Sequence, residues 1–467
     1  MLKILYPLKF ENEKHYIIYT VFNYFLKIDN ISVEFSDQIS ENEVIISFDN
    51  SQESKNLILY NGFFNQNQTD WLSIKTLPTL PIEYTNLNNL NGKFLFNELP
   101  VLFGKNENEI VYESNNSIYC NVDLLGGIFF FLTLYEEVVL DNIDEHERFN
   151  FKDSFTYKSN LYTRPVVNEY LDVLIALLAK IGFDKINNNR FYQLVVSHDV
   201  DVPFSNNATL FNFTRNILAD IFIRKTLITP LRKILAKLIP IKTLKYRIDP
   251  YNNFDYIMNV SDKFGIRSTF NFIATNGKGD IDGNYDIEDN FFRKLFQQIQ
   301  GRGHLIGLHP SYYTMTNRVL LTNQFDKFEK IVNNNHTNLV KINARQHYLR
   351  WKNPITWQLY NDVGITQDSS IGSEYFLGFR CGTCYEYPVF NLITKKPLNV
   401  TELPLLIMDV CAFKSKDTIK TLNNILEINN ACKFYKGQMT LLYHNNYIVT
   451  MKEKKKYEHL LSMLLSN

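Results

Sequence analysis

From Phe191 to Asn467, short apolar runs alternate with longer segments that carry apolar residues at helical spacing. Short apolar runs bounded by turn residues are typical of buried strands, and helical spacing is typical of helices that cover a sheet. The alternation therefore predicts an α/β domain, and over roughly 270 residues it favours a (β/α) barrel. The expected strands are 195–196, 268–274, 305–308, 342–344 and 439–443, and the expected helices are 254–264, 288–300, 322–333 and 355–363.

Residues 1–190 have a different pattern. Strand-like runs at 43–48 and 57–60 come first, and helical patterns over 127–140 and 166–181 follow. With 467 residues and a hydrophobic content of 45%, the chain can build two cores. We therefore predict an N-terminal α+β domain at 1–190, of unknown role, and a second domain at 191–467 with a basic amphipathic insertion at about 207–250.

The insertion is strongly basic. Residues 215–247 hold nine Lys and Arg residues but one acidic residue, Asp220, and apolar residues lie between the charges. A pair of basic amphipathic helices can lie on an anionic membrane, so the segment predicts a peripheral membrane contact. A helical hairpin that packs on the barrel and exposes a basic face explains the same residues, and both interpretations stay open. Over the whole chain 49 basic and 49 acidic residues balance, so we expect no nucleic-acid partner.

Two acidic residues close the first strand of the predicted barrel, in the run Val195-Val196-Ser197-His198-Asp199-Val200-Asp201. Side chains alternate along a strand, so Asp199 and Asp201 lean toward the same side. Barrels of this class hold their reactive groups at the carboxyl ends of the strands. One carboxylate can bind a divalent metal while the other accepts a proton from water.

Four later strand ends also carry polar groups that can do chemistry. His309 follows an apolar run at 305–308, and His444 follows another at 439–443. Arg345 and His347 follow the strand predicted at 342–344, and Asp368 comes soon after Val363-Gly364-Ile365. Five successive strand ends of this kind indicate one shared site.

In this order, the residues resemble the polysaccharide deacetylase domain (NodB homology, carbohydrate esterase family 4). The resemblance covers about residues 191–460 and implies a distorted (β/α) barrel. It also implies a carbohydrate N-deacetylase, a hydrolase of linear amide C–N bonds. The first half, with Gly126-Gly127 to Glu137 and Arg148-Phe149, resembles an uncharacterised domain that precedes the deacetylase in some bacterial proteins.

The resemblance assigns catalytic roles to four residues. Asp199 matches the general base, and Arg345 matches the arginine that orients it. His444 matches the histidine that acts as general acid, and Asp368 matches the acidic residue that pairs with this histidine.

The resemblance also implies a divalent metal ion held by Asp201 and His309. The family's second histidine ligand is replaced here by Tyr313. Catalytic zinc sites normally have three protein ligands, so we expect His347 to be the third, with His198 and His304 as alternatives. Zinc is the first choice of metal, and cobalt, nickel and manganese are the others. Arg380, Tyr313 and Trp351 are the expected substrate contacts.

The expected substrate is an N-acetylated sugar of surface polysaccharide metabolism, linked to a lipid or a nucleotide. The first residues lack a secretion signal and no apolar stretch reaches the length of a membrane span, so we expect a cytoplasmic protein, or one at the inner face of the membrane. Because Tyr313 replaces a ligand, a non-catalytic carbohydrate-binding or scaffold protein on the same fold is the main alternative. Hydrolysis of a non-sugar amide is a third.

Overall fold

The computed structural model describes residues 1–48, 55–105, 109–184, 186, 189–205, 210–275, 281–333, 342–414 and 418–466. The chain divides into two compact units. Unit 1 comprises residues 1–192, 378–404 and 430–437, and unit 2 comprises 193–377, 405–429 and 438–467. The sequence pattern predicts one boundary, at residue 190, whereas two later segments also belong to unit 1. Residues 207–209 of the predicted insertion lie outside the described residues.

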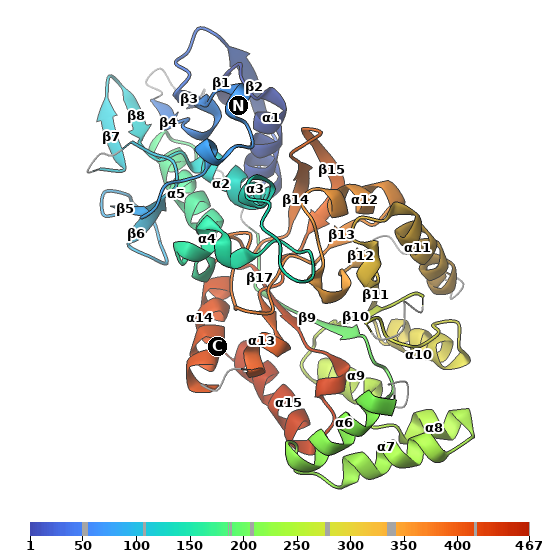
Figure 1. Cartoon of the computed structure of the whole chain (residues 1–467). Coiled ribbons are helices and arrows are strands. Elements are labelled where there is room, and N and C mark those ends of the chain that lie inside the picture. Colours follow the sequence, from blue (N-terminus) through green and yellow to red (C-terminus); the bar gives the residue numbers. More distant parts are fainter. Residues whose placement is uncertain are drawn as a thin grey trace. The chain divides into compact units, whose positions relative to one another are not determined.

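A mixed sheet forms the centre of unit 1, in the order β2-β1-β3-β4-β8-β7 (Figure 1). β1 is parallel to β2 and antiparallel to β3, while β4 is parallel to β8. β14 and β15, from the later part of the chain, pair as an antiparallel hairpin, and β5 and β6 form a separate two-stranded sheet. The strands of unit 1 are β1 (Leu2–Pro7), β2 (Ile31–Ser36), β3 (Glu43–Phe48), β4 (Asn56–Tyr60), β5 (Glu83–Asn86), β6 (Glu98–Val101), β7 (Val111–Ser114), β8 (Ser117–Cys120), β14 (Tyr387–Asn391) and β15 (Lys396–Glu402).

The helices of unit 1 include one, α2, in which every residue is buried. A Cβ atom at Gly127 would lie 2.4 Å from the ring of Tyr170, so glycine allows α2 and α5 to approach closely. The single helix predicted over 127–140 is interrupted at Leu134, whose φ of 50° is left-handed. The α-helices are α1 (Glu11–Ile18), α2 (Leu124–Leu132), α3 (Tyr135–Val139), α4 (Phe155–Lys158) and α5 (Val166–Lys180).

Parallel strands form the sheet of unit 2, in the order β13-β12-β11-β10-β9-β17-β16. Between the two ends of this order, Leu405 N donates a hydrogen bond of 2.9 Å to Ile371 O, which joins the segment before β16 to the segment after β13. Unit 2 is thus a mixed α/β unit whose strands all end at one edge. The strands are β9 (Gln193–Val200), β10 (Thr269–Phe272), β11 (Leu305–Leu308), β12 (Asn343–Ala344), β13 (Gln367–Asp368), β16 (Ile407–Met408) and β17 (Gln438–Leu442).

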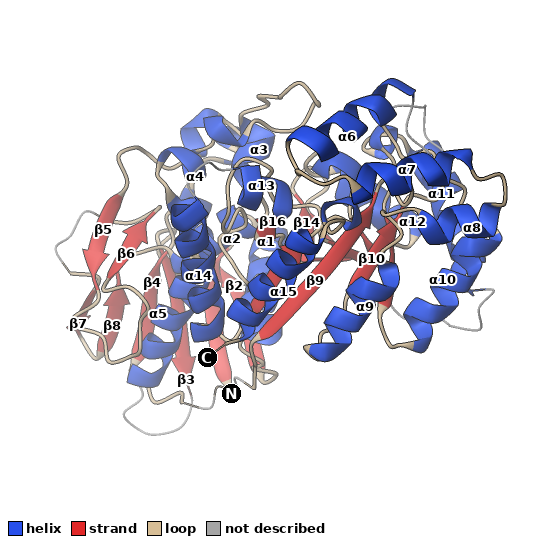
Figure 2. Cartoon of the chain, turned by 90° about the horizontal axis from the view of Figure 1, so that it is seen from below, coloured by secondary structure: helices blue, strands red, loops and turns tan. Residues whose placement is uncertain are grey.

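Amphipathic helices cover the strands of unit 2 (Figure 2). In α10, for example, Phe292, Leu295, Phe296 and Ile299 are buried at helical spacing. Among the described residues, no helix is long and apolar enough to cross a membrane. The α-helices are α6 (Leu210–Phe222), α7 (Ile228–Leu238), α8 (Lys242–Ile248), α9 (Phe254–Lys263), α10 (Asn290–Gly301), α11 (Arg318–Asn333), α12 (Ile355–Val363), α13 (Asp409–Lys414), α14 (Thr418–Phe434), whose last residues belong to unit 1, and α15 (Met451–Leu465).

Candidate active site

The central strand β9 supplies the two acidic residues of the site. Asp199 lies within β9 and its side chain is buried, whereas Asp201 comes just after the strand and is 24% exposed. β9 lies between β10 and β17 and is parallel to both, so the carboxyl ends of all three strands meet at the same edge. Side chains that follow neighbouring strands can therefore reach the two carboxylates.

Asp201 lies with two histidines in an arrangement that suits a divalent metal ion. His309, the residue after β11, places Nε2 3.1 Å from Asp201 Oδ1, and His347 places Nε2 3.6 Å from the same oxygen. One ligand atom from each of the three residues lies within 4.8 Å of the other two. No other group of this kind occurs in the part of the chain that the structure describes.

The other nitrogen of each imidazole is already engaged. His309 Nδ1 lies 2.5 Å from the backbone oxygen of Arg345, and His347 Nδ1 lies 2.7 Å from Asp282 Oδ1. An imidazole that donates from Nδ1 carries a lone pair on Nε2, and this is how metal-binding histidines are usually held. Both lone pairs then face a carboxylate oxygen that is buried and accepts no hydrogen bond within the described residues. Such a donor set requires a cation or protons between its members, so the residues fit a divalent metal.

Electrostatics lead to the same conclusion. The pKa of Asp201 lies well below its usual range, because His347 and His309 outweigh the effect of burial. Burial lowers the pKa of His347, but Asp201 and Asp282 raise it by more, to about 9. Without a metal, His347 is therefore protonated and its charge balances Asp201, and a bound cation would take the place of that proton.

The loop after β10 supports this group through a close backbone approach. Asp282, which holds His347, also accepts a hydrogen bond of 2.8 Å from Tyr312 N. A Cβ atom at Gly283 would lie only 1.7 Å from the backbone oxygen of Asp201. The loop can therefore lie against the end of β9 only with glycine at this position.

Asp199 has one carboxylate oxygen held and the other directed toward the histidines. Oδ1 accepts hydrogen bonds from Asn271 Nδ2 at 2.7 Å and Arg345 Nη1 at 3.1 Å, and Oδ2 lies 3.8 Å from His309 Nε2. Burial raises the pKa of Asp199, but Arg345 and the nearby histidines more than offset it and lower the pKa overall. Asp199 is thus ionised at neutral pH and can accept a proton.

His444, two residues after β17, contributes a cation on the other side of Asp201. Its Nε2 lies 3.6 Å from Asp201 Oδ2, and its Nδ1 lies 2.9 Å from Asp409 Oδ1. Asp409 also accepts a hydrogen bond of 2.6 Å from the backbone N–H of His444. Burial lowers the pKa of His444, but the carboxylate of Asp409 raises it by more, so that the pKa is about 10. The imidazole is therefore protonated at neutral pH.

The predicted pairing of Asp368 with His444 is wrong. Asp368 accepts hydrogen bonds from Trp357 Nε1 at 3.1 Å and from Ser370 N at 2.9 Å. The sheet order explains the difference, because Asp409 follows β16, the strand next to β17, whereas β13, which carries Asp368, is not a neighbour of β17.

Two of the three predicted substrate contacts are engaged elsewhere. Arg380 belongs to unit 1, where Nε and Nη2 donate to the buried carboxylate of Glu137 at 2.9 and 2.8 Å. Trp351 is 2% exposed and packs against Trp357 with ring centroids 4.6 Å apart, so it belongs to the core. Tyr313 is 44% exposed, and its contact with the substrate stays a prediction.

The two alternative metal ligands also have structural roles. His198 is fully buried, its Nδ1 lies 2.6 Å from Tyr443 O, and burial lowers its pKa to about 4. His304 Nε2 lies 3.2 Å from Asp262 Oδ1. Neither residue belongs to the group around Asp201.

Sequence reasoning missed Asn271, Asp282 and Asp409. Asn271 is the register partner of Asp199 on β10, and a Cβ atom at Gly307 of β11 would lie 2.1 Å from its side-chain oxygen. Asp409 follows the apolar run 405–408, the same strand-end signal that revealed the other residues. Asp282 precedes a glycine and resembles an ordinary turn residue.

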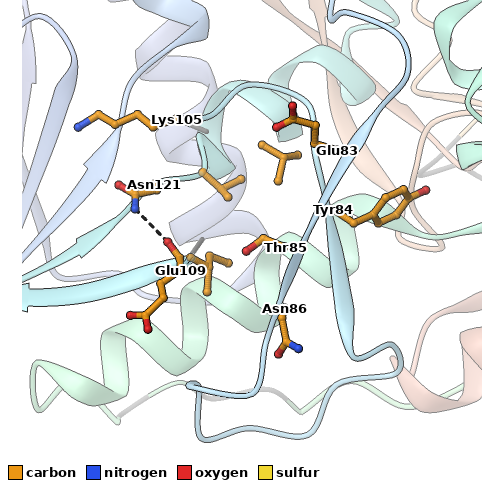
Figure 3. Close-up of a pocket in the computed structure, with 10 residues that line it drawn as sticks. Glu83, Tyr84, Thr85, Asn86, Lys105, Glu109 and Asn121 are labelled. Carbon is orange, nitrogen blue, oxygen red and sulfur yellow. Dashed lines mark hydrogen bonds between the residues drawn. The ribbon is translucent and has the colours of Figure 1, made fainter. Parts of the chain in front are cut away.

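Unit 1 contains a separate cavity of about 410 Å³ (Figure 3). Glu83, Lys105 and Glu109 are among the residues that line it, and Asn121 Nδ2 donates to the backbone oxygen of Glu109 at 3.0 Å. This lining includes none of the metal-ligating group described above.

Comparison with known proteins identifies the first part of the chain as similar to an uncharacterised family. Residues 2–182 match the model of DUF7033, a family of unknown function. No curated protein matches the chain.

Two solved structures share low similarity with the chain. One is described as a "putative polysaccharide deacetylase" from Mycobacterium smegmatis, with 13% identity, a TM-score of 0.38, and coverage of 61% of this chain and 87% of that one. The other is Puue allantoinase, with 11% identity, a TM-score of 0.34, and coverage of 58% and 82%.

Proposed function

We propose that unit 2 is a metal-dependent hydrolase that removes an N-acetyl group from a sugar. The observation that carries this proposal is the position of the Asp201, His309 and His347 group between an ionised Asp199 and a protonated His444. Hydrolysis of an amide needs a base for the attacking water and an acid for the leaving nitrogen. Two titratable groups whose environments separate their protonation states in this way are suited to these two roles.

The proposed reaction breaks the amide C–N bond and forms a C–O bond to water. A divalent ion held by Asp201, His309 and His347 would polarise the carbonyl group and lower the pKa of water to about 7. Asp199 accepts the proton of the attacking water through Oδ2, because Asn271 and Arg345 hold Oδ1. His444 donates its Nε2 proton to the leaving nitrogen, and Asp409 fixes the ring through Nδ1. The products are acetate and a free amine.

The fold that we propose for unit 2 is a distorted (β/α) barrel of the polysaccharide deacetylase type. The order of parallel strands and the position of the site at their carboxyl ends support it. The hydrogen bond from Leu405 N to Ile371 O lies between the two ends of that order. The N-acetyl sugar as substrate follows from the sequence resemblance, and its link to a lipid or a nucleotide is a further part of the proposal.

A non-catalytic carbohydrate-binding protein was the main alternative, because Tyr313 replaces the family's second histidine. The position of His347, with Nε2 3.6 Å from Asp201 Oδ1, supports a third ligand from a different strand end. Because His347 can replace the missing histidine ligand, we favour an enzyme over a binding protein. Zinc is the first candidate because two imidazoles and a carboxylate are typical of catalytic zinc, and cobalt, nickel and manganese remain to be compared.

Metal analysis of the protein purified without chelator tests the proposal. We expect about one equivalent of divalent metal, its loss in His309→Ala, and its retention in His146→Ala, a surface histidine of unit 1. Acetate release is then measured with N-acetyl sugars in free, nucleotide-linked and lipid-linked form. Absence of metal after loading with zinc, cobalt, nickel or manganese, together with retained glycan binding, would establish the binding protein instead.

A further inference from the structure

Helix α7 directs its apolar side away from the protein. Leu231, Ile234, Leu235 and Leu238 follow the i, i+3, i+4, i+7 spacing, and all four are exposed, Leu238 to 72%. The buried side contains Thr229, Lys233 and Ala236 instead. A helix that covers a protein core normally has the opposite orientation, with its apolar stripe inward.

The two neighbouring helices extend this apolar surface. Figure 1 shows α6, α7 and α8 in the green part of the ribbon, and consecutive helices of the three pack on each other. We call these three helices and their connections the outer layer (residues 210–248). Thirteen of the 31 large apolar side chains that are exposed among the described residues lie here. They are Leu210, Phe211, Leu218, Phe222, Ile223, Leu227, Ile228, Leu231, Ile234, Leu235, Leu238, Ile241 and Leu244.

Buried ion pairs join the helices of the outer layer to each other, and one more holds the layer to α15. Asp220 and Lys233 are fully buried and 2.7 Å apart, and Arg224 Nη1 lies 2.7 Å from the other Asp220 oxygen. Arg224 also reaches Glu453 of α15 at 2.9 Å. The side of α6 and α7 that faces the protein thus holds a buried ion-pair network, whereas the large apolar side chains of α7 are exposed. Exposed apolar surface on this scale is unusual in a monomer and indicates an interaction site.

The charge of the outer layer indicates which partner fits. Its only acidic residue, Asp220, is buried in the ion pairs, while Arg215, Lys225, Lys237 and Arg247 are exposed. Nearby α15 adds the exposed Lys452, Lys455 and Lys456. Helices with outward Leu, Ile and Phe side chains flanked by Lys and Arg insert into the interface of anionic bilayers. A second copy of the chain would instead bring like charges together.

We propose that the outer layer is a docking surface for an anionic membrane. Two contacts attach it beside the candidate active site, one between the residues that flank it and one from the α6–α7 connection. Ser205, four residues after Asp201, donates to Asp249 through its backbone N and its hydroxyl at 3.0 and 2.9 Å. Arg224 Nη2 donates to the backbone oxygen of Asn446 at 3.4 Å, two residues after His444.

The layer that carries the docking surface is therefore hydrogen-bonded to the segments that carry Asp201 and His444. This position favours a substrate whose N-acetyl sugar is anchored in the bilayer through a lipid over a nucleotide-linked one. The choice of substrate rests on the proposed function, whereas the docking surface does not.

Sedimentation of the full chain with vesicles tests the docking surface. We expect binding to vesicles of phosphatidylcholine with phosphatidylglycerol, little binding to phosphatidylcholine alone, and weaker binding at high salt. The double variant Leu231→Glu/Leu238→Glu should bind at least ~10-fold more weakly, and each of Lys225→Gln and Lys237→Gln about fivefold. The control Val319→Glu, at a residue of α11 that is also 72% exposed, should bind like the native protein. Far-ultraviolet circular dichroism and thermal unfolding confirm that each variant is folded.

Three outcomes would overturn the proposal. One is that the native chain fails to bind anionic vesicles, and another is that Val319→Glu weakens binding as much as the double variant. The third is a dimer in light scattering that Leu231→Glu/Leu238→Glu dissociates, without vesicle binding by either protein. Asp199→Asn, which removes the proposed base, should still bind vesicles, so a failure of the chemistry is distinguishable from a failure of docking.

Discussion

Two buried acidic residues of unit 1 are neutralised in a different way from Asp201 in the candidate site of unit 2. In unit 1, Glu137 pairs with Arg380 through two hydrogen bonds of 2.8 and 2.9 Å, and Glu169 pairs with Arg164 through two of 2.6 and 3.0 Å. In unit 2, the buried Oδ1 of Asp201 faces two imidazole nitrogens and accepts no hydrogen bond within the described residues.

The difference separates structural charge from functional charge. A buried charge without a partner costs several kcal/mol, so a folded chain retains one where a ligand or a proton completes it. The closed pairs of unit 1 fix neighbouring segments to each other. In unit 2, the Nε2 atoms of His309 and His347 converge on Asp201, where a metal ion can take the place of a histidine proton.

The largest effect that this comparison predicts comes from Asp199→Asn. The amide cannot accept the proton of water, so turnover should fall by about 10³-fold. The metal content should not change, because Asp199 lies outside the group of Asp201, His309 and His347. Acetate release and elemental analysis of the same preparation measure both quantities. Turnover that equals that of the native protein would disprove the role of Asp199 as base.

Much of the site in unit 2 could be predicted, because strand ends leave a local signal. Asp201, His309, Arg345 and His444 each follow an apolar run that the structure shows as a strand. Asp282 lies in a loop and leaves no such signal, and Asp409 has the signal but its partner depends on which strands are neighbours. That order follows from tertiary packing, and it makes β16, but not β13, a neighbour of β17.

The helices also show what the sequence alone could not predict. The apolar residues of α10 and α7 have identical spacing, at 292, 295, 296, 299 and at 231, 234, 235, 238. The first set is buried and the second is exposed. Periodicity therefore predicts that a helix is amphipathic, but the surroundings decide which face meets the protein.

The closed pairs of unit 1 predict a loss of stability without a loss of activity. In Glu137→Gln, Arg380 stays buried without its counter-charge, so the free energy of unfolding should fall by about 3 kcal/mol. Urea unfolding measures this change. Replacing both residues, in Glu137→Gln/Arg380→Met, removes the unpaired charge and should restore much of the stability. A fall in acetate release by the folded single variant would contradict the structural role of the pair and return Arg380 to the list of substrate contacts.

A smaller loss of metal affinity is expected at Asp282, which contacts the metal-binding group but does not belong to it. Asp282→Asn weakens the hold on His347 Nδ1, and losses of this kind typically lower metal affinity by about 10–100-fold. Competition with a chelator measures the affinity. Asp286→Asn, at a nearby acidic residue that is 54% exposed, is the matched control and should bind metal as the native protein does. If Asp282→Asn also binds metal normally, the acid is not needed to orient His347.

The smallest effect is a change in pH dependence on the other side of the site. Asp409 raises the pKa of His444, which must be protonated to act as an acid, so activity should fall as the pH rises through that pKa. In Asp409→Asn the raising charge is lost, and the alkaline limb of the pH profile of kcat/KM should move down by about one pH unit or more. The acidic limb should stay in place, because it reports the ionisation of Asp199, whose oxygen Oδ1 is held by Asn271 and Arg345. The variant Asp368→Asn is the matched control, because the sequence alone could not tell which carboxylate pairs with His444. Asp368 accepts hydrogen bonds from Trp357 and Ser370, so this variant should leave the alkaline limb unchanged. A shift of that limb in Asp368→Asn but not in Asp409→Asn would reverse the assignment.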